Sequence, residues 1–511
     1  MPSSHSNHAP HNQHHSQQAI ISPFLTSPPT PPDENTPGHN SFDLILKHGH
    51  QDLVQAVSFN TYGDRCATGS VDGKIRVFNR HKDGIWRHCD NWTAHAGGEI
   101  LELQWLAPTI YPNLLASLGI EGRFKIWAED PSAAPGRRFS NAATGHGGRF
   151  GAAAAGTGNT TPAHQGGQSQ QSASSPSALK GNNSSGAGAT TDNKPKAAFE
   201  TRNSRSPYRS FSMKHVDDTR HTYLALLSAD GTLTVYENEQ PENLSDYTQM
   251  DQFTVCPKPA RGEETAFKVQ FDPNLDVCYT ALRAGVPGDA LGLVVAAMDS
   301  VKIYRTRDTV AASLGVATAA KEFYLAAEIS TGVHRGLVRD VAWAPGNIRG
   351  YDILATACQD GYVRVFGLST PVEEGAEQRG WGVDELKKYS KNNAPPTGQD
   401  GKTAAAAGGQ EEGEYIPAAA KSGIRAGLDQ SRVAADRSWS GLPGQVRHVV
   451  TELSKLDSHR TPVWRVGFDD DGRILGSVGD EGRLMCYRQT PDGSWAKSTE
   501  LAMMKMRMAA P

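Results

Sequence analysis

The stretch that decides the fold is VDGKIRVF, at residues 71–78. It consists of an acidic residue and a glycine, followed by alternating apolar residues that end on an aromatic. The same phrase recurs as IEGRFKIW (120–127), ADGTLTVY (229–236), QDGYVRVF (359–366) and DEGRLMCY (480–487), with a weaker copy, MDSVKIY, at 298–304. Asp-Gly suits a tight turn between strands, because glycine adopts a positive φ without steric cost. The phrase therefore predicts a turn and a strand that occur six times.

The residues around each copy predict further short strands. In the first unit, VQAVSF (54–59) and RCATGS (65–70) precede the turn, and IWRHCDNW (85–92) follows the strand that the turn begins. Alternation with a period of two, interrupted by turn residues, indicates consecutive antiparallel strands. Four-stranded units that recur about every 40–45 residues are typical of a β-propeller. We therefore predict an all-β, six-bladed propeller.

Composition divides the chain into folded and disordered parts. The propeller is expected over 42–503, in three pieces: 42–130, 207–371 and 447–503. Residues 1–41 form a His-, Ser- and Pro-rich tail, and 504–511 a short C-terminal tail. The inserts 131–206 and 372–446 are rich in Gly, Ala and polar residues, so they bury too little apolar surface to offset chain entropy, and we predict that they are disordered apart from a short helix in the second.

Several function classes find no support in the sequence. The net charge of −4 provides no positive field for nucleic acid. The six cysteines are scattered without a CxxC pair, and no apolar run approaches the roughly 18 residues of a membrane helix. No nucleophile-elbow or zinc motif is present. We therefore expect a soluble intracellular protein with no catalytic residue, metal or cofactor, which neither binds nucleic acid directly nor spans a membrane.

The repeated units resemble WD40 repeats. A histidine precedes the first strand of four units, and an acidic residue stands in the turn of the same four. These four pairs are His50 and Asp72, His95 and Glu121, His334 and Asp360, and His459 and Glu481. The resemblance implies that each pair joins a buried hydrogen-bond network. Because the pairs recur once per blade, they favour a structural role over general acid–base chemistry. The Trp-Asp dipeptide of the family is missing, but an aromatic residue is kept at the position of its tryptophan: Phe78, Trp127, Tyr236, Tyr304, Phe366 and Tyr487.

The number of units raises the question of how the propeller is closed. A closed propeller usually pairs an N-terminal strand into its last blade, but the sixth unit supplies its own fourth strand, SWAKSTELA (494–502). FDLILKH (42–48) is a candidate latch strand. An open ring leaves strand edges that invite another chain to pair with them. The residues alone leave both the open and the closed ring possible.

The ordered segments also resemble the Seh-type nucleoporins, WD40 propellers of the Y-shaped outer-ring coat of the nuclear pore. The resemblance is clearest over 48–131 and in VRDVAWAPGNIRGYDILATACQDGYVRVF of the fifth unit, which also resembles a COPII vesicle-coat propeller. It implies an open six-bladed propeller, completed in trans by a blade from an α-solenoid nucleoporin. It further implies other Y-complex subunits as partners, support of nucleocytoplasmic transport of mRNA and protein at the nuclear envelope, and a second role in the TOR-regulating SEA/GATOR complex at the vacuolar or lysosomal surface.

If this resemblance holds, the first and sixth units accept the partner blade. The candidate contacts are Val54, Val57 and Phe59 on one side, and Val463, Trp464, Val466 and Phe468 on the other. The alternative for each is that it only packs its own blade. Two other functions also remain: a COPII-type coat propeller, and a WD40 adaptor or substrate receptor with a closed ring.

The N-terminal tail contains candidate phosphorylation sites. Ser22, Ser27, Thr30 and Thr36 each precede proline, as proline-directed kinases require. Phosphates there would place like charges along the tail. The alternative is a Pro- and Ser-rich tail with no regulatory role.

Overall fold

The structure is a computed structural model. It describes residues 46–107, 113–130, 132–133, 138–139, 178–180, 196–313, 316–329, 332–346, 350–370, 437, 439 and 444–502. The chain separates into two units, 1–47 and 48–511, and every strand described below belongs to the second. The candidate phosphorylation sites, most of both inserts and the tail 504–511 lie outside the described residues.

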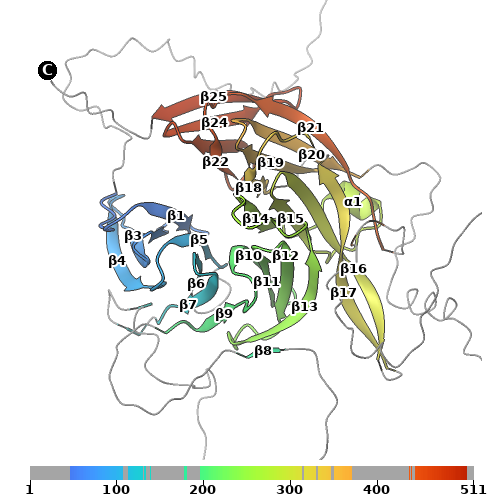
Figure 1. Cartoon of the computed structure of the whole chain (residues 1–511), viewed down its shortest axis with the longest axis horizontal. Helices are drawn as coiled ribbons and strands as arrows, with labels where there is room; N and C mark the ends of the chain where they lie inside the picture. The colour runs from blue at the N-terminus through green and yellow to red at the C-terminus, as the bar shows by residue number, and fades with distance from the viewer. Residues whose placement is uncertain are drawn as a thin grey trace, which may run out of the picture. The chain divides into compact units, whose positions relative to one another are not determined.

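The described strands form six antiparallel sheets, which follow one another in chain order from the blue β1 to the red β25 in Figure 1. The first sheet contains β1 (Val54–Phe59), β2 (Arg65–Ser70), β3 (Lys74–Arg80) and β4 (Trp86–Thr93). The second contains β5 (Ile100–Trp105), β6 (Leu114–Gly119), β7 (Arg123–Ala128) and β9 (Phe199–Arg202). The third contains β10 (Tyr208–Val216), β11 (His221–Ser228), β12 (Thr232–Asn238), β13 (Asp246–Thr254) and β8 (Ala178–Lys180).

The other three sheets have four strands each. The fourth contains β14 (Phe267–Phe271), β15 (Gly292–Ala297), β16 (Ser300–Ser313) and β17 (Val316–Ile329). The fifth contains β18 (Val338–Trp343), β19 (Asp352–Cys358), β20 (Val363–Ser369) and β21 (Val449–Leu456). The sixth contains β22 (Val463–Phe468), β23 (Ile474–Gly479), β24 (Arg483–Gln489) and β25 (Trp495–Ala502). The predicted all-β, six-bladed propeller is confirmed.

The repeated phrase forms the turn between the second and third strands of a sheet, as its residues predict. In the first sheet, Gly73 has a φ of 73°, and its backbone N–H donates to the carbonyl of Ser70. A Cβ at Gly73 would lie 2.2 Å from the carbonyl oxygen of His95, so the turn also needs glycine for space. The weaker copy in the fourth sheet lacks this glycine, and Met298 takes the positive φ of 62° instead.

Two sheets take their fourth strand from beyond an insert. β9 pairs with β7, although 199–202 falls within 131–206, which composition assigned to a disordered insert. Its four residues are too few to give a clear alternating pattern. β21 pairs with β20 across residues 371–436. The folded part of the second sheet therefore extends beyond the sequence-based boundary at 130.

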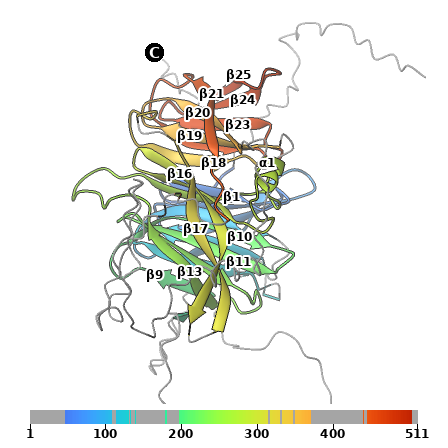
Figure 2. The ribbon, with the colours of Figure 1, turned by 90° about the vertical axis from the view of Figure 1, so that its right-hand side faces the viewer.

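One hairpin and one short helix depart from the regular blades. β16 and β17 are 14 residues each and pair from Val301 and Ile329 to Ser313 and Val316. They therefore run past the six-residue β15, as Figure 1 shows, and Figure 2 shows the same two strands from the side. The helix α1 (Tyr279–Arg283) lies in the β14–β15 connection, over a small cluster that includes Cys278 and Ala281. None of the described helices is both long and apolar enough to cross a membrane.

Apolar clusters join each sheet to the next. Within the described residues, one cluster joins the first and second sheets, and four more continue to the sixth. The innermost strands pack in the same order: β1, β5, β10, β14, β18 and β22. No comparable packing between described strands returns from the sixth sheet to the first. Six sheets with five such interfaces leave one face of the first sheet and one of the sixth without a neighbouring sheet.

Candidate partner-binding surface

The inner strand of the first sheet exposes residues whose equivalents are buried in other sheets. Val57 and Phe59 are 55% and 56% exposed. The equivalent pairs are covered by the preceding sheet and are at most 5% exposed in the third, fourth and fifth sheets, where they are Phe211 and Met213, Val269 and Phe271, and Val341 and Trp343. In the first sheet no preceding sheet covers the pair. Val57 and Phe59 therefore mark an apolar surface open to a partner.

The sixth sheet has an uncovered face as well. The second strands of the second to fifth sheets are buried throughout, apart from His221 at the start of β11, but β23 alternates between buried and half-buried residues. On its less buried side lie Ile474 and Val478, with Leu484 and Cys486 of β24 beside them. Leu501 of β25 pairs with Leu484 and is 55% exposed. Apolar residues exposed together mark a surface for a partner.

The structure divides the predicted partner contacts into two groups. Val57 and Phe59 lie on the uncovered face, and Val54 is half-buried. Val463, Val466 and Phe468 instead belong to the cluster between the fifth and sixth sheets, so they pack their own blade. Because side chains alternate along a strand, the uncovered face carries Arg465 and Gly467. The sequence analysis did not predict these two residues as partner contacts.

Trp464 is the remaining predicted contact, and it is 42% exposed. Its ring lies 4.5 Å from the guanidinium carbon of Arg339 of the fifth sheet, a cation–π contact, and its indole N–H donates to Asp480. The side chain therefore already has partners within the chain, at the border of the sixth sheet with the fifth.

The predicted candidate latch at 42–48 is only partly described. Residues 46–48 form no strand, and 42–45 lie outside the described residues. The fourth strand of the sixth sheet is β25, from its own end of the chain, as the sequence predicts.

Three of the four histidine–acid pairs are in hydrogen-bond contact. His50 Nδ1 lies 3.2 Å from Asp72, His95 Nδ1 lies 2.6 Å from Glu121, and His459 Nδ1 contacts Glu481. Because a carboxylate only accepts, Nδ1–H donates to it, and Nε2 accepts a hydroxyl hydrogen bond. Ser117 provides this hydroxyl for His95 at 2.8 Å, and the Trp127 indole donates to the same Ser117 oxygen at 2.9 Å. The histidine thus links the turn to the aromatic that ends the repeated phrase.

The fourth pair differs in geometry. His334 Nε2 lies 3.0 Å from Thr356, but the carboxylate of Asp360 accepts from Arg364 and from the backbone N–H of Arg335. Burial acts to raise the pKa of Asp360, but the hydrogen bonds from Arg364, Cys358 and the backbone N–H groups of Tyr362 and Arg335 together outweigh it, and the pKa falls to about 2. Burial and the charge of Arg364 lower the pKa of His334 to about 4. A single arginine has replaced the histidine as the partner of the turn carboxylate.

A buried ionic cluster that the sequence did not reveal joins the fourth and fifth sheets. Arg305 of β16 is fully buried; its guanidinium donates to Asp352 at 2.7 Å and to His448 at 3.0 Å, and lies 3.7 Å from Asp272. Burial, together with the charge of Asp352, raises the pKa of Asp272 to about 6. Because these residues are far apart in the sequence, no local sequence pattern predicts the cluster.

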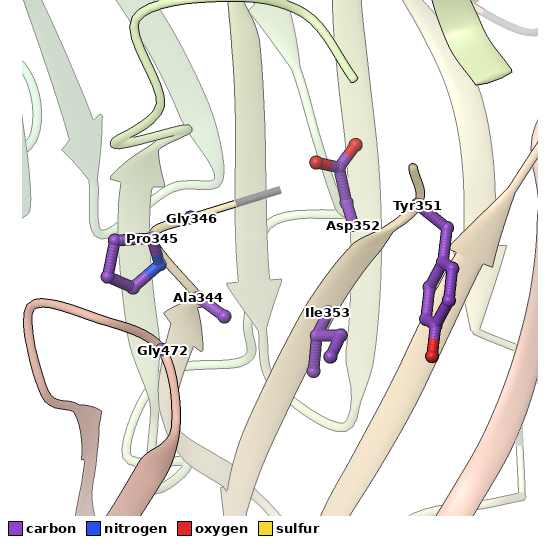
Figure 3. A pocket seen from close by; sticks show the side chains of 7 residues that line it. All are labelled: Ala344, Pro345, Gly346, Tyr351, Asp352, Ile353 and Gly472. Carbon is purple, nitrogen blue, oxygen red and sulfur yellow. The ribbon is translucent and has the colours of Figure 1, made fainter. Parts of the chain in front are cut away.

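Asp352 also borders a cavity of about 10 Å³. Figure 3 shows its lining: Ala344, Pro345, Gly346, Tyr351, Asp352, Ile353 and Gly472. A cavity of this size holds one water molecule, so it is a detail of the packing between sheets and too small for a substrate.

The described residues give little support to a metal site or a reactive cysteine. They contain no group of three or more His, Cys, Asp and Glu side chains placed to hold a metal ion. All six cysteines are free. Burial raises the pKa of the Cys66, Cys256 and Cys358 thiols to about 11, so these thiols stay protonated and unreactive near neutral pH.

The fold and its repeated turn define a WD40-type β-propeller, and the family model "WD domain, G-beta repeat" matches residues 43–79. The chain is 56% identical to "Nucleoporin SEH1" of Chaetomium thermophilum, over 96% of this chain and 99% of that relative. It is 24% identical to "Nucleoporin SEH1" of Saccharomyces cerevisiae, over 86% and 94%, and 21% identical to "Nucleoporin seh1" of Schizosaccharomyces pombe, over 87% and 91%. The chain belongs to the nucleoporin SEH1 family.

Proposed function

We propose that this chain is a structural scaffold subunit of the outer-ring coat of the nuclear pore, at the nuclear envelope, where it supports transport of mRNA and protein. SEH1 nucleoporins and WD40 propellers are structural, non-enzymatic families, and we assign the chain no reaction. The observation that carries the proposal is the pair of uncovered faces on the first and sixth sheets, because a scaffold subunit needs a surface for its neighbour.

We further propose that an α-solenoid nucleoporin inserts a blade against these two faces and completes the propeller in trans. Val57 and Phe59 would be buried by it on one side, and the half-buried residues of β23 and β24 on the other. Burial of apolar surface contributes about 25 cal/mol per Å², and the free inner edge of β1 invites further strand contacts. The same surface would accept the corresponding α-helical subunit of the SEA/GATOR complex.

The proposal is tested by capture of partners with the full chain and its variants. Phe59→Glu places a charge on the uncovered face, while Tyr62→Glu is the matched control, a 72% exposed aromatic in the β1–β2 turn of the same sheet. We expect wild type and Tyr62→Glu to retain Y-complex subunits, identified by mass spectrometry, and Phe59→Glu to lose the solenoid nucleoporin. Equal retention by both variants would contradict the insertion surface.

The identity of the captured proteins separates the alternative functions. Y-complex subunits support the pore coat, and SEA/GATOR subunits support the second role. COPII subunits alone would place the chain in a vesicle coat, and ubiquitin-ligase subunits alone would make it a substrate receptor; either result would overturn the proposal.

A further inference from the structure

The six inner strands share one equivalent position, and in three of the sheets its side chain links the sheet to the next. This junction position lies three residues before the last core residue of the strand, and it is occupied by Ala56, Glu102, Ser210, Lys268, Asp340 and Arg465. In five sheets it directly follows a register irregularity, between Val54 and Ala56 in the first sheet and between Val463 and Arg465 in the sixth. The residues are therefore structurally equivalent.

At three of these positions the side chain accepts a backbone N–H of the following sheet. Glu102 accepts from Phe211 N at 3.0 Å, Ser210 from Val269 N at 3.1 Å, and Asp340 from Val466 N at 3.1 Å. Each donor is the residue that follows the junction position of the next sheet. In the first sheet that residue is Val57. A polar acceptor at the junction position thus fixes the next blade by its main chain.

A cation occupies the junction position twice, with different surroundings. Lys268 is paired within the ring: its Nζ lies 2.8 Å from Glu102 Oε1 and 3.9 Å from Asp340 Oδ1. Glu102 therefore accepts at once from a backbone N–H and from the cation of another sheet. This arrangement shows what a carboxylate can do at this position when a cation lies beside it.

Arg465 has no carboxylate within ion-pair distance among the described residues, although its charge acts at longer range on the buried carboxylate of Asp340 in the fifth sheet. Its side chain is exposed and forms no hydrogen bond or ion pair within 4 Å with any described residue. Guanidinium has five donors and no acceptor, so it cannot hold the main chain of a following blade as Asp340 does. Gly467, the other residue of this strand on the uncovered face, has no side chain. The sixth sheet thus presents an exposed positive charge, without a hydrogen bond or close ion pair to any described residue, on the face that a further blade would cover.

We propose that the blade inserted beside the sixth sheet carries Asp or Glu at its own junction position, and that this carboxylate binds Arg465 and the N–H of Val57. The inference rests on the proposed function, since it concerns the chemistry of the donated blade. It follows the geometry of Asp340, whose carboxylate lies 3.9 Å from Lys268 of the preceding sheet and accepts the N–H of Val466 of the following sheet at 3.1 Å. A carboxylate with two charge-assisted partners is stronger and more specific than a neutral contact.

The test measures binding of the α-solenoid nucleoporin that co-purifies with the full chain. The variants are Arg465→Glu and Arg465→Gln, with Arg473→Glu as matched control, because Arg473 is an exposed arginine in the β22–β23 turn of the same sheet. We expect Arg465→Glu to weaken the Kd at least tenfold, Arg465→Gln to weaken it less, and Arg473→Glu to leave it within twofold. Circular dichroism verifies that each variant is folded. A second arm replaces each Asp and Glu of the donated inner strand by Lys, one at a time, and one of these should restore binding to Arg465→Glu.

The outcomes separate this inference from the proposed function. If wild type binds the nucleoporin and Arg465→Glu binds as well as Arg473→Glu, the charge pairing is wrong and the scaffold function stands. Loss of binding that none of the Asp→Lys or Glu→Lys exchanges restores would also overturn the pairing. If wild type captures no solenoid nucleoporin at all, the scaffold function fails and the pairing fails with it.

Discussion

Asp360 and Arg364 show how one residue changes a repeated network. In the first, second and sixth sheets the turn carboxylate receives a histidine N–H, whereas Arg364 takes the carboxylate in the fifth. Among the described residues, His334 then keeps a side-chain hydrogen bond to Thr356 and a ring contact with Phe366, and it lies close to a positive charge. Both effects, together with burial, favour the neutral imidazole.

His334 is therefore expected to make stability depend on pH. Its pKa is about 4 in the folded chain, against about 6.5 when unfolded, so only the unfolded state binds the proton between these values. The contribution is absent above pH 6.5 and lowers stability as the pH falls toward 4, by about 2 kcal/mol at pH 5. The charged groups around it are Arg364, Asp360 and Asp299.

Urea unfolding of wild type and His334→Gln at pH 7 and pH 5 measures this effect. The glutamine variant keeps a neutral polar side chain, so the difference between the two curves isolates His334 from other histidines. We expect wild type to lose about 2 kcal/mol more than the variant between the two pH values. Equal losses would show that the ring is protonated in the folded chain.

Strand β25 is the element that decides how the sixth sheet is completed and which of its faces stays exposed. Because it completes the sixth sheet from the C-terminal end of the chain, that sheet needs no N-terminal strand. Trp495 at its start is 4% exposed and contacts Phe468 at a ring-centroid distance of 5.7 Å, within the cluster shared with the fifth sheet. The strand is thus fixed to the fold on one side only, while Leu501 faces outward.

Two substitutions on β25 separate its two sides. Trp495→Ala removes a buried aromatic, and we expect it to cost about 3–5 kcal/mol of unfolding free energy. Leu501→Ala, on the exposed side, should stay within about 0.5 kcal/mol in the isolated chain. Chemical denaturation measures both. A large loss for Leu501→Ala would mean that this face is covered within the chain.

At the scale of the whole molecule, five apolar interfaces join the six sheets, and the described residues supply no sixth interface between the last sheet and the first. The exposed apolar residues Val57, Phe59 and Leu501 lie on the two faces where we propose that the partner blade binds. The buried ionic cluster at Arg305 and the inner-strand acceptors Glu102, Ser210 and Asp340 add polar contacts at four of the five interfaces, from the second sheet to the sixth.

We expect the isolated full chain to aggregate and to become soluble when co-expressed with its solenoid partner, because exposed apolar surface and open strand edges promote association. Light scattering of the chain alone and of the co-purified complex measures this. The double substitution Val57→Lys and Phe59→Lys should reduce aggregation of the isolated chain. A monodisperse, thermally stable wild-type chain would count against an open propeller.

The sequence by itself determined the all-β class, the six repeats and most of the buried histidine–acid pairs, because these follow from local alternation and from turn residues at fixed spacing. It missed the short β9, where four residues carry too little pattern. It selected Val463, Val466 and Phe468 as partner contacts, although they pack against the fifth sheet, because alternation alone does not say which side a neighbour covers. Only the tertiary structure decided that Arg465 faces outward and that Arg305 joins two sheets, because both depend on contacts between residues far apart in the chain.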